Sequence, residues 1–372
     1  MSSPVPARRI SPLSQLVAVA GLLLTAACGG GDGSGTSATA ASSSSSGSSS
    51  ASTAEGGTDL TGTKGTLTIY SGRNQELVEP VLRNFNKATG IGVEARYGES
   101  AELAAQLIEE GDQPAADVFF SQDAGALGAL SQEDRLTKLP AEQLERVSPR
   151  FRSDEGTWVG VSGRARVIVY APGKISGPVP TSIYDLTESA YSGQVGYAPT
   201  NASFQAFVTG LRVSAGEEKA REWLEAFKDN KPKTYANNIA VLDAVNDGQI
   251  SAGLINHYYW YEKVAELGAD KVTAKLSYPK DGDPGALVNV AGAGVLEGAA
   301  EPDLAQQFVD YLLKPEAQRY FANTTYEYPL VQGVGPAAGL PPLSGISGPD
   351  IDLSELSSLA ETLELLNEVG LT

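Results

Sequence analysis

Residues 66–120 alternate short β-prone runs with stretches whose apolar residues recur at helical spacing. The two helical stretches end at Gly90 and Gly111, and glycine is a typical helix stop. The resulting order, β-α-β-α-β, predicts a parallel sheet covered by helices, with ligands bound at the carboxyl ends of its strands. The predicted strands are 66–70, 91–97 and 116–120, and the predicted helices are 77–88 and 100–108.

A second α/β pattern begins near residue 167. Ser214 and Glu217 have the spacing of a capping box, which predicts the start of a helix whose apolar face covers 220–227. The predicted strands are 167–170, 195–198, 252–255 and 286–290, and helical patterns at 304–313 and 356–366 are expected to return to the first region.

The two patterns together predict an α/β protein of two lobes, each a mixed sheet flanked by helices. Strands near 164–170 and 286–293 are expected to cross between the lobes and to leave a cleft. A cleft that closes on its ligand by hinge motion is the arrangement of periplasmic binding proteins. We expect residues 64–165 and 291–372 to form the first lobe and residues 166–290 the second.

The N-terminal residues have the pattern of an export signal. Arg8 and Arg9 precede an apolar run at 16–27, and small residues lead to Cys28. The sequence LTAAC, which ends at Cys28, resembles a bacterial lipobox and predicts a lipid on that cysteine after removal of residues 1–27. The alternative is an ordinary secretory signal with an incidental cysteine.

Residues 28–63 are mostly glycine, serine, alanine and threonine. Such a segment buries too little apolar surface to offset the entropy of ordering it, so we expect a flexible tether. No later stretch is apolar for the ~20 residues that a membrane span needs, so the remainder is expected to be soluble. The predicted location is the outer face of the cytoplasmic membrane, with the protein held by its lipid.

Composition excludes several classes of function. The chain has 372 residues and a net charge of −18, which argues against nucleic acid as a partner. One cysteine excludes an internal disulfide and a cysteine-based metal cluster, and one histidine, His257, excludes a histidine-rich metal site. With no phosphate-binding loop and no paired-carboxylate motif, the chain is not expected to be an enzyme.

Tyr258 and Tyr259 are the residues with the most telling chemistry. They follow a predicted strand, and at a strand-to-helix junction two neighbouring phenols can point to one spot in a cleft. A phenol has a pKa of ~10 and binds metals poorly, but a trivalent cation stabilises the phenolate. Oxygen anions suit hard cations. The alternative is that this aromatic run is amphipathic core packing.

Seven segments in the same order resemble the ferric-iron-binding proteins of ABC transporters, over about residues 66–335. The resemblance implies a type II periplasmic-binding-protein-like fold, and phenolate ligation of Fe³⁺ by Tyr258 and Tyr259. The segments are TLTIYSGRNQEL (66–77), ADVFFSQDAGAL (116–127), VSGRARVIVY (161–170), GYAPTNASF (196–204), LINHYYW (254–260), DPGALVNVAGAGVL (283–296) and EYPL (327–330).

The resemblance also implies that a synergistic anion, carbonate or phosphate, binds beside the iron. A guanidinium fork suits such an oxyanion, whereas the alternative for Arg164 is a surface or interlobe salt bridge. Ser203 and Asn238 are alternatively helix caps. The positions that correspond to the anion's usual holders are Arg164, Asn201, Ala202, Ser203, Asn238 and Asn256.

Three positions depart from the pattern of the family. Many relatives have histidine at the position of Asn74 and glutamate at that of Gln122, both metal ligands, and some have tyrosine at that of Asn201. Neutral amides are weak ligands for a trivalent ion, so water, exogenous anions or another acid must contribute. Glu76 and Asp123 are candidates, with solvated helix-start carboxylates as the alternative. His257 is interpreted as a packed or outer-shell residue.

The resulting hypothesis is an exported lipoprotein that captures Fe³⁺ with an anion in its cleft and delivers it to an ABC importer. Its partners would be the permease and its ATPase, and the protein itself is expected to be a monomer. The alternative is the same fold binding another solute, such as an oxyanion, a polyamine or a thiamine-like molecule. The adjacent phenols discriminate, because an organic solute does not need them.

Overall fold

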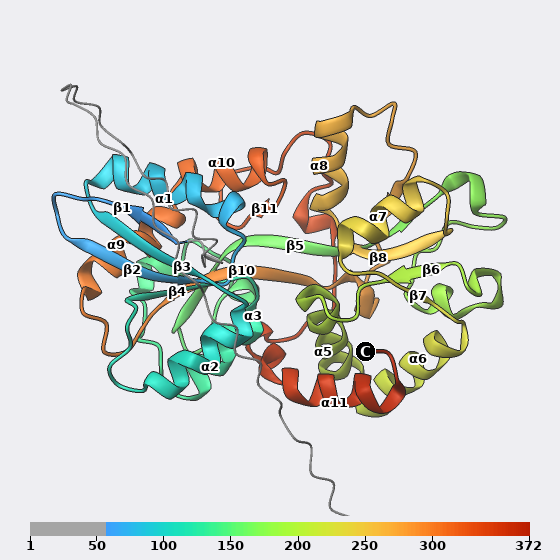
Figure 1. The fold of residues 1–372 in the computed structure, drawn as a ribbon, viewed down its shortest axis with the longest axis horizontal. Helices are drawn as coiled ribbons and strands as arrows, with labels where there is room; N and C mark the ends of the chain where they lie inside the picture. Colours follow the sequence, from blue (N-terminus) through green and yellow to red (C-terminus); the bar gives the residue numbers. More distant parts are fainter. Residues whose placement is uncertain (1–56) are drawn as a thin grey trace, which may run out of the picture. The chain divides into compact units, whose positions relative to one another are not determined.

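The computed structural model describes residues 57–372, whose strands join into one hydrogen-bonded sheet (Figure 1). The predicted signal, lipidation site and most of the predicted tether lie outside the described residues. The strands are β1 (Thr58–Leu60), β2 (Thr66–Ser71), β3 (Gly92–Tyr97), β4 (Val118–Ser121), β5 (Trp158–Tyr170), β6 (Val195–Tyr197), β7 (Lys233–Thr234), β8 (Ala252–Asn256), β9 (Lys275–Ser277), β10 (Val288–Val295) and β11 (Tyr328–Pro329).

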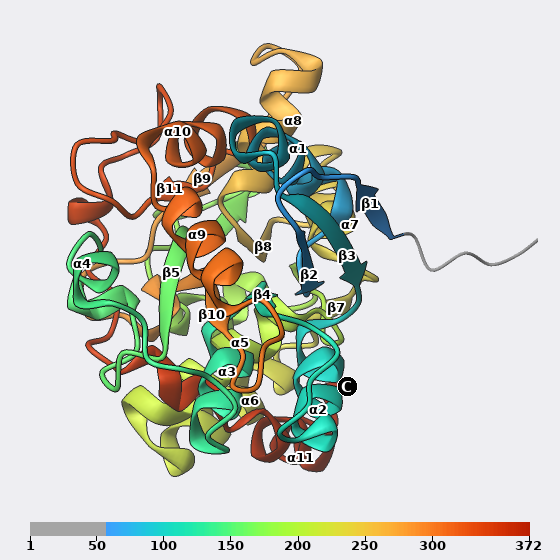
Figure 2. The same ribbon diagram turned by 90° about the vertical axis from the view of Figure 1, so that its left-hand side faces the viewer.

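The helices cover both faces of the sheet, as the views in Figures 1 and 2 show for α1 and α10 on one side of β2 and β3 and α2 on the other. The helices are α1 (Gln75–Thr89), α2 (Ser100–Glu110), α3 (Ala124–Gln132), α4 (Ala141–Leu144), α5 (Ala202–Ala215), α6 (Glu217–Asp229), α7 (Asn238–Asn246), α8 (Tyr258–Leu267), α9 (Pro302–Leu312), α10 (Pro315–Thr324) and α11 (Leu359–Val369). Within residues 57–372, no helix combines the length and the apolar composition that crossing a membrane requires.

The first part of the sheet has the predicted parallel arrangement. Strand β2 pairs in parallel with β3 and with β4, so the chain does form β-α-β-α-β here. Strand β10 then pairs antiparallel with β4, which makes this part a mixed sheet. The carboxyl ends of β2 and β4 lead into residues 72–74 and 122–123, so these loops lie at one edge of the sheet.

Strand β5 passes from one part of the sheet to the other. Its first residues pair with β10 up to Ala165, and from Arg166 onward it pairs with β8. Beyond β8 lie β6 and β7, both parallel to it. This 13-residue strand is longer than the pattern at 167–170 predicted, because residues 158–165 contain four small residues that hide its periodicity.

The apolar cores of the two parts are separate. The first core contains Phe85, Phe119 and Phe308, while Phe204 and Trp223 belong to the second. The chain leaves the first core after Ala165 and re-enters it at Leu287. This division resembles the predicted lobes, although the predicted domain boundaries themselves stay a prediction.

The C-terminal segment corrects one part of the predicted division. The short 3₁₀ helix η7 (Leu353–Ser357) packs on α3, where the carbonyl oxygens of Leu356 and Ser354 would lie 2.4 Å from a Cβ at Gly125 and Gly128. Only glycine allows that approach. After Ser358 the chain crosses over, and α11 packs on α5 and α6 of the second part.

The prediction that all of 291–372 belongs to the first lobe is therefore wrong for α11. Arg212 of α5 donates hydrogen bonds to the Ser358 carbonyl and to Thr362 Oγ1, both at 2.7 Å. The apolar pattern at 356–366 indicated a buried helix face, but it contains no information on which core that face joins. The C-terminal segment consequently contacts both parts of the molecule.

Two further predictions need correction. The tether was predicted to reach residue 63, but Thr58–Leu60 pairs antiparallel with β3 as β1, so the folded part starts earlier. The predicted capping box is also wrong. Ser214 lies inside α5, where its hydroxyl donates to the Gly210 carbonyl at 2.6 Å, and Gly216 precedes α6.

Candidate functional site

The two adjacent tyrosines open α8, directly after β8. Their rings lie on the same side of the chain, with centroids 4.2 Å apart and planes inclined by 33°. Tyr258 is 5% exposed and Tyr259 is half-buried. The expectation that both phenols face one place therefore agrees with the structure.

Burial, followed by the charge of Tyr259, raises the pKa of Tyr258 well above 10, against the opposing influence of Arg164. Without a cation, Tyr258 is thus a neutral phenol at neutral pH. Only a strongly charged ion bound beside it would displace its proton. Divalent or weakly bound ions provide less of the required electrostatic stabilisation.

A buried ion pair lies beside the tyrosines. Arg73, in the loop after β2, donates from Nη1 and Nη2 to the two carboxylate oxygens of Glu327 at 2.9 and 2.7 Å. The side chains are only 2% and 1% exposed. Burial opposes ionisation of Glu327, but Arg73 outweighs it, and the pKa of Glu327 lies below its ordinary value. Both charges are therefore retained inside the protein.

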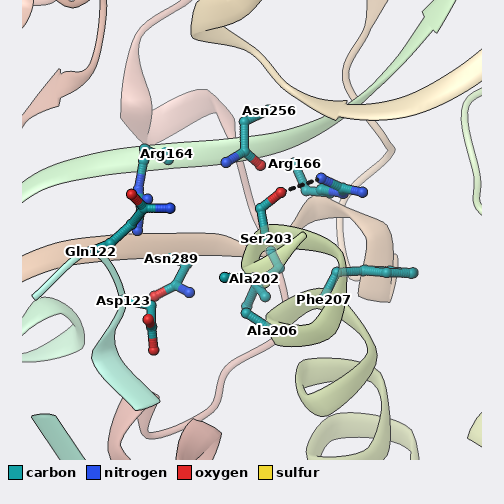
Figure 3. A pocket seen from close by; sticks show the side chains of 11 residues that line it. Gln122, Asp123, Arg164, Arg166, Ala202, Ser203, Ala206, Phe207, Asn256 and Asn289 are labelled. Carbon is teal, nitrogen blue, oxygen red and sulfur yellow. Dashed lines mark hydrogen bonds between the residues drawn. The ribbon is translucent and has the colours of Figure 1, made fainter. Parts of the chain in front are cut away.

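Arg164 and Arg166 stand two residues apart on β5 and line a small cavity (Figure 3). Arg166 donates from Nη1 to Ser203 Oγ at 3.0 Å and from Nη2 to the Leu254 carbonyl at 3.1 Å. Burial lowers its pKa to about 9. The lining residues are Gln122, Asp123, Arg164, Arg166, Ala202, Ser203, Ala206, Phe207, Asn256, Leu287 and Asn289.

Arg164 is 3% exposed, yet its guanidinium makes no hydrogen bond within residues 57–372. Its nearest acidic partner is Glu327, whose Oε1 lies 3.9 Å from Nε. The predicted alternative, a salt bridge of Arg164, is therefore present only as this long contact, because the Glu327 carboxylate is already hydrogen-bonded by Arg73. Burial, and then the charge of Arg73, lower the pKa of Arg164. An anion in the cavity would offset both effects.

Polar side chains at the start of α5 complete the cavity wall. Asn201 caps α5, since its Oδ1 accepts from the Ser203 amide at 3.0 Å and from the Ser203 hydroxyl at 2.6 Å. Asn238 donates to Asn201 Oδ1 and to Ser203 Oγ, at 3.1 and 2.9 Å. The N-terminus of α5, at Ala202, therefore faces the cavity together with two arginines, and a helix N-terminus favours anions.

The alternative that Ser203 and Asn238 are helix caps is wrong. The cap of α5 is Asn201, two residues before Ser203, and the cap of α7 is Asn237, directly before Asn238. Asn237 Oδ1 accepts from the Ala240 amide at 2.9 Å. Asn238 instead donates to Ser203 Oγ, which also accepts from Arg166.

Asn74 and Gln122, at positions where many relatives have metal ligands, have different surroundings in the structure. Asn74 is exposed and caps α1 through the Glu76 amide, at 2.8 Å, whereas Gln122 lines the cavity. Glu76 is exposed, in agreement with a solvated helix-start carboxylate. Asp123 caps α3 but is half-buried in the cavity wall, and burial raises its pKa, so the solvated alternative is wrong for this residue.

His257 is fully buried between the two parts of the molecule. Its Nδ1 accepts from the Ala165 amide at 3.1 Å, so the proton is on Nε2, which donates to the Tyr326 carbonyl at 2.8 Å. The ring stacks on Tyr328 at 4.7 Å. These contacts agree with a packed residue, and they hold the first turn of α8 against β5.

The burial of His257 predicts a pH dependence of stability. Burial lowers the pKa of His257 from 6.5 to about 4, although its hydrogen bond with the Tyr326 carbonyl and then the charge of Glu327 oppose the shift. Between these values the unfolded chain takes up a proton that the folded protein does not. The free energy of unfolding should therefore fall with decreasing pH by roughly 3 kcal/mol in total from this group.

Urea unfolding of metal-free protein at pH 4 to 8 would measure this effect, with His257→Gln as the reference. Glu262 acts in the opposite direction, since burial raises its pKa to about 7, so the difference between the two proteins is the relevant quantity. A difference that does not change between pH 6.5 and 4 would contradict the assignment of a neutral, buried imidazole.

Several residues of this site were missed in the sequence. Arg73 and Glu327 lie in segments that resemble the ferric-binding family, but nothing local distinguishes them from surface charges. Arg166 could have been found, because residues two apart on a strand point to the same face and Arg164 was already selected. Within residues 57–372, no group of three or more His, Cys, Asp or Glu is arranged to hold a metal ion.

Comparisons with known proteins place the chain among binding proteins. The family described as "Bacterial extracellular solute-binding protein" matches residues 113–343. The chain is 34% identical to the Fe(3+)-binding periplasmic protein of Serratia marcescens over 307 residues, which cover 82% of this chain and 90% of the relative.

Two solved structures support the same relationship. Iron-bound HitA from Pseudomonas aeruginosa superimposes with a TM-score of 0.77 at 35% identity, over 82% of this chain and 99% of that one. A Trichodesmium protein (IdiA, FutA) in complex with iron and citrate gives a TM-score of 0.73 at 28% identity, over 82% and 100% of the two chains. The predicted type II periplasmic-binding-protein-like fold is confirmed.

Proposed function

Because the chain belongs to the family of bacterial extracellular solute-binding proteins, we propose that it captures Fe³⁺, together with an anion, and delivers it to an ABC importer. Like its relatives, the chain is a solute-binding protein and not an enzyme. Binding would bring together groups from both parts of the molecule, with β5 and β10 as the connections about which the cleft closes.

The observation that carries the proposal is the pair of phenols in contact at the start of α8. In the metal-free protein, burial keeps Tyr258 protonated, so it offers a neutral oxygen to weakly charged ions. A trivalent ion reverses this balance, since its field stabilises two phenolates at once. Hard oxygen anions and a hard cation match, and a softer metal would find no thiolate or free imidazole here.

We expect the anion in the cavity at the start of α5, whose lining includes Asn256, two residues before Tyr258. Arg164 has unpaired donors there, Arg166 adds a second charge and Ala202 begins a helix. Carbonate and phosphate both present several oxygens to such a set of donors. Asn201, Ser203, Asn238 and Asn256 would hold the anion directly or through the network around Ser203, and an anion bound there would neutralise part of the charge of both metal and arginines.

An oxyanion alone is the second candidate ligand, because the cavity is lined by two buried guanidinium groups. The same groups argue against a polyamine or a thiamine-like cation, which they would repel. A simple oxyanion, however, gives no role to Tyr258 and Tyr259, so the ferric proposal explains more of the site.

The decisive experiment is a titration of purified metal-free protein with ferric nitrilotriacetate, followed in the visible spectrum. Phenolate-to-iron charge transfer should give an orange to red colour that saturates at one iron per protein. A protein that stays colourless, shows no thermal stabilisation with Fe³⁺ and is stabilised by phosphate or sulfate alone would refute the ferric proposal in favour of the second candidate.

The proposal includes export and anchoring by a lipid on Cys28, with residues 29–57 as the tether that lets the protein reach its permease and ATPase as a monomer. Replacing Cys28 by alanine should move the protein from the membrane fraction to the medium. Its retention in the membrane fraction would exclude the lipid as the anchor.

A further inference from the structure

The C-terminal segment attaches first to the part of the molecule that contains α3. Its 3₁₀ helix η7 buries Leu353 and Leu356 in the first core, where each is 3% exposed. The last residue of η7, Ser357, donates from its hydroxyl to Gln132 Oε1 of α3 at 3.2 Å. The close approach of η7 to the glycines of α3 leaves no room for a looser contact. The segment up to Ser357 is therefore fixed to the first part.

From Ser358 onward the segment is attached to the second part. Arg212 of α5 donates from Nη1 to the Ser358 carbonyl and to Thr362 Oγ1, both at 2.7 Å. Glu217 holds the same guanidinium through Nε and Nη2, at 2.9 and 2.6 Å, and so fixes its orientation. Leu366 of α11 is 1% exposed and belongs to the second core. The chain from Ser358 to its end is therefore fixed to the second part.

A single peptide unit, between Ser357 and Ser358, joins the two attachments. The Cα atoms of consecutive residues lie about 3.8 Å apart across a trans peptide, so this link can rotate about its single bonds but cannot extend. Helix η7 also lies beside α5, so the two parts approach each other at the link.

The strands β5 and β10 are a second connection at a different place. Figures 1 and 2 both show these strands in the middle of the molecule and α11 beneath them. Two bodies joined at two separate points that cannot stretch can turn only about the line through those points. Rotation about another axis would have to pull η7 or α11 out of its core.

We propose that the link between Ser357 and Ser358 is a second hinge point, which confines the relative motion of the two parts to one axis through the link and the pair β5 and β10. Asp123 and Ser203, which line the cavity from the two parts, would then return to the same relative position at each closure (Figure 3). A motion with fewer directions loses less entropy when a ligand stops it. The inference rests on the proposed function in that such a protein closes on its ligand.

The test is an insertion of two glycines between Ser357 and Ser358, which keeps every side chain of η7 and α11 and lengthens the link by up to about 7 Å. Spin labels on Glu109→Cys in α2 and Glu222→Cys in α6, both exposed positions, report the separation of the two parts in metal-free protein. Cys28→Ala keeps the native cysteine from being labelled. The insertion should broaden the distribution of label distances by up to about 7 Å.

The matched control is the same insertion after Gly335, an exposed position at which a Cβ would meet nothing within 4 Å. It should leave the distribution as narrow as without any insertion. A distribution that stays narrow with the lengthened link, or an equal broadening in the control, would overturn the second hinge point.

Gly128→Val decides the case in which the lengthened link prevents folding, as judged by circular dichroism. A Cβ at this position would lie 2.4 Å from the Ser354 carbonyl oxygen, so the valine displaces η7 from α3 while α11 keeps its contacts. The label distances should broaden in this variant also, and an unchanged distribution would overturn the proposal.

These measurements use no iron, so they separate this inference from the ferric proposal. A protein that stays colourless with ferric nitrilotriacetate would refute ferric binding and leave the distance result as measured. A coloured protein whose distance distribution ignores the lengthened link would overturn the hinge point alone.

Discussion

Replacing Tyr258 and Tyr259 together by phenylalanine should abolish the visible colour of the ferric protein and reduce its affinity for Fe³⁺ by more than about 100-fold. Loss of a residue that only supports a metal ligand lowers metal affinity by up to about 100-fold. The effect should be larger here because two direct ligands are lost. The phenolate oxygens are the two charges of the protein that offset the ion in the proposed site. Visible spectra and competition with citrate measure the two effects.

The fold should tolerate this double substitution. Phenylalanine retains the rings, whose contact, with centroids 4.2 Å apart, does not need the hydroxyls. Changes that conserve shape in a packed site usually cost less than about 1.5 kcal/mol. Tyr261→Phe is the matched control, since its hydroxyl donates to the Gly339 carbonyl at 3.1 Å, away from the pair. Wild-type colour in the double variant would remove the basis of the ferric proposal.

Replacing Arg73 by methionine should lower the free energy of unfolding by about 3 kcal/mol, which is at the lower end of the range for breaking a buried pair. The loss leaves the Glu327 carboxylate buried without its two hydrogen bonds. Arg164 Nε, 3.9 Å from Glu327, keeps the loss from being larger. Urea unfolding of the metal-free protein at pH 7 measures the change.

Two further variants test whether the unpaired Glu327 carboxylate causes that loss of stability. Combining Arg73→Met with Glu327→Gln removes the unpaired charge and should recover part of the stability. Arg146→Met breaks an ion pair with Asp310 in which both side chains are about one-third exposed, and exposed pairs contribute less than about 1 kcal/mol. If Arg73→Met cost no more than Arg146→Met, the buried pair would not be a determinant of stability.

The local pattern of the sequence predicted the β-α-β-α-β order of residues 66–120. Strand β2 and helix α1 were predicted to within about two residues, because side-chain periodicity and end signals depend only on neighbouring residues. The same locality explains the interpretation of Tyr258 and Tyr259, since a strand-to-helix junction orients adjacent side chains without help from distant parts of the chain.

The sequence was insufficient where packing overrides a local signal or chooses the partner of a helix. Ser214 has the composition and spacing of a cap, yet α5 continues through it because Phe207 and Leu211 bury their face in the second core. In the same way, the sequence of α11 shows an apolar face but does not indicate which core that face packs against. Packing, which involves residues far apart in the chain, decided both cases.

The charged part of the site was decided by tertiary structure alone. Arg73 and Glu327 are 254 residues apart in the chain, and nothing near either residue identifies the other. The position of α8 beside this pair is likewise tertiary, since the charges of Glu327 and Arg73 act on the pKa of Glu262 in that helix. The sequence by itself thus determined the β-α-β-α-β order of residues 66–120 and the candidate phenols, because these depend on short-range geometry. The structure determined which charges surround the phenols, because long-range pairing depends on how the whole chain is folded.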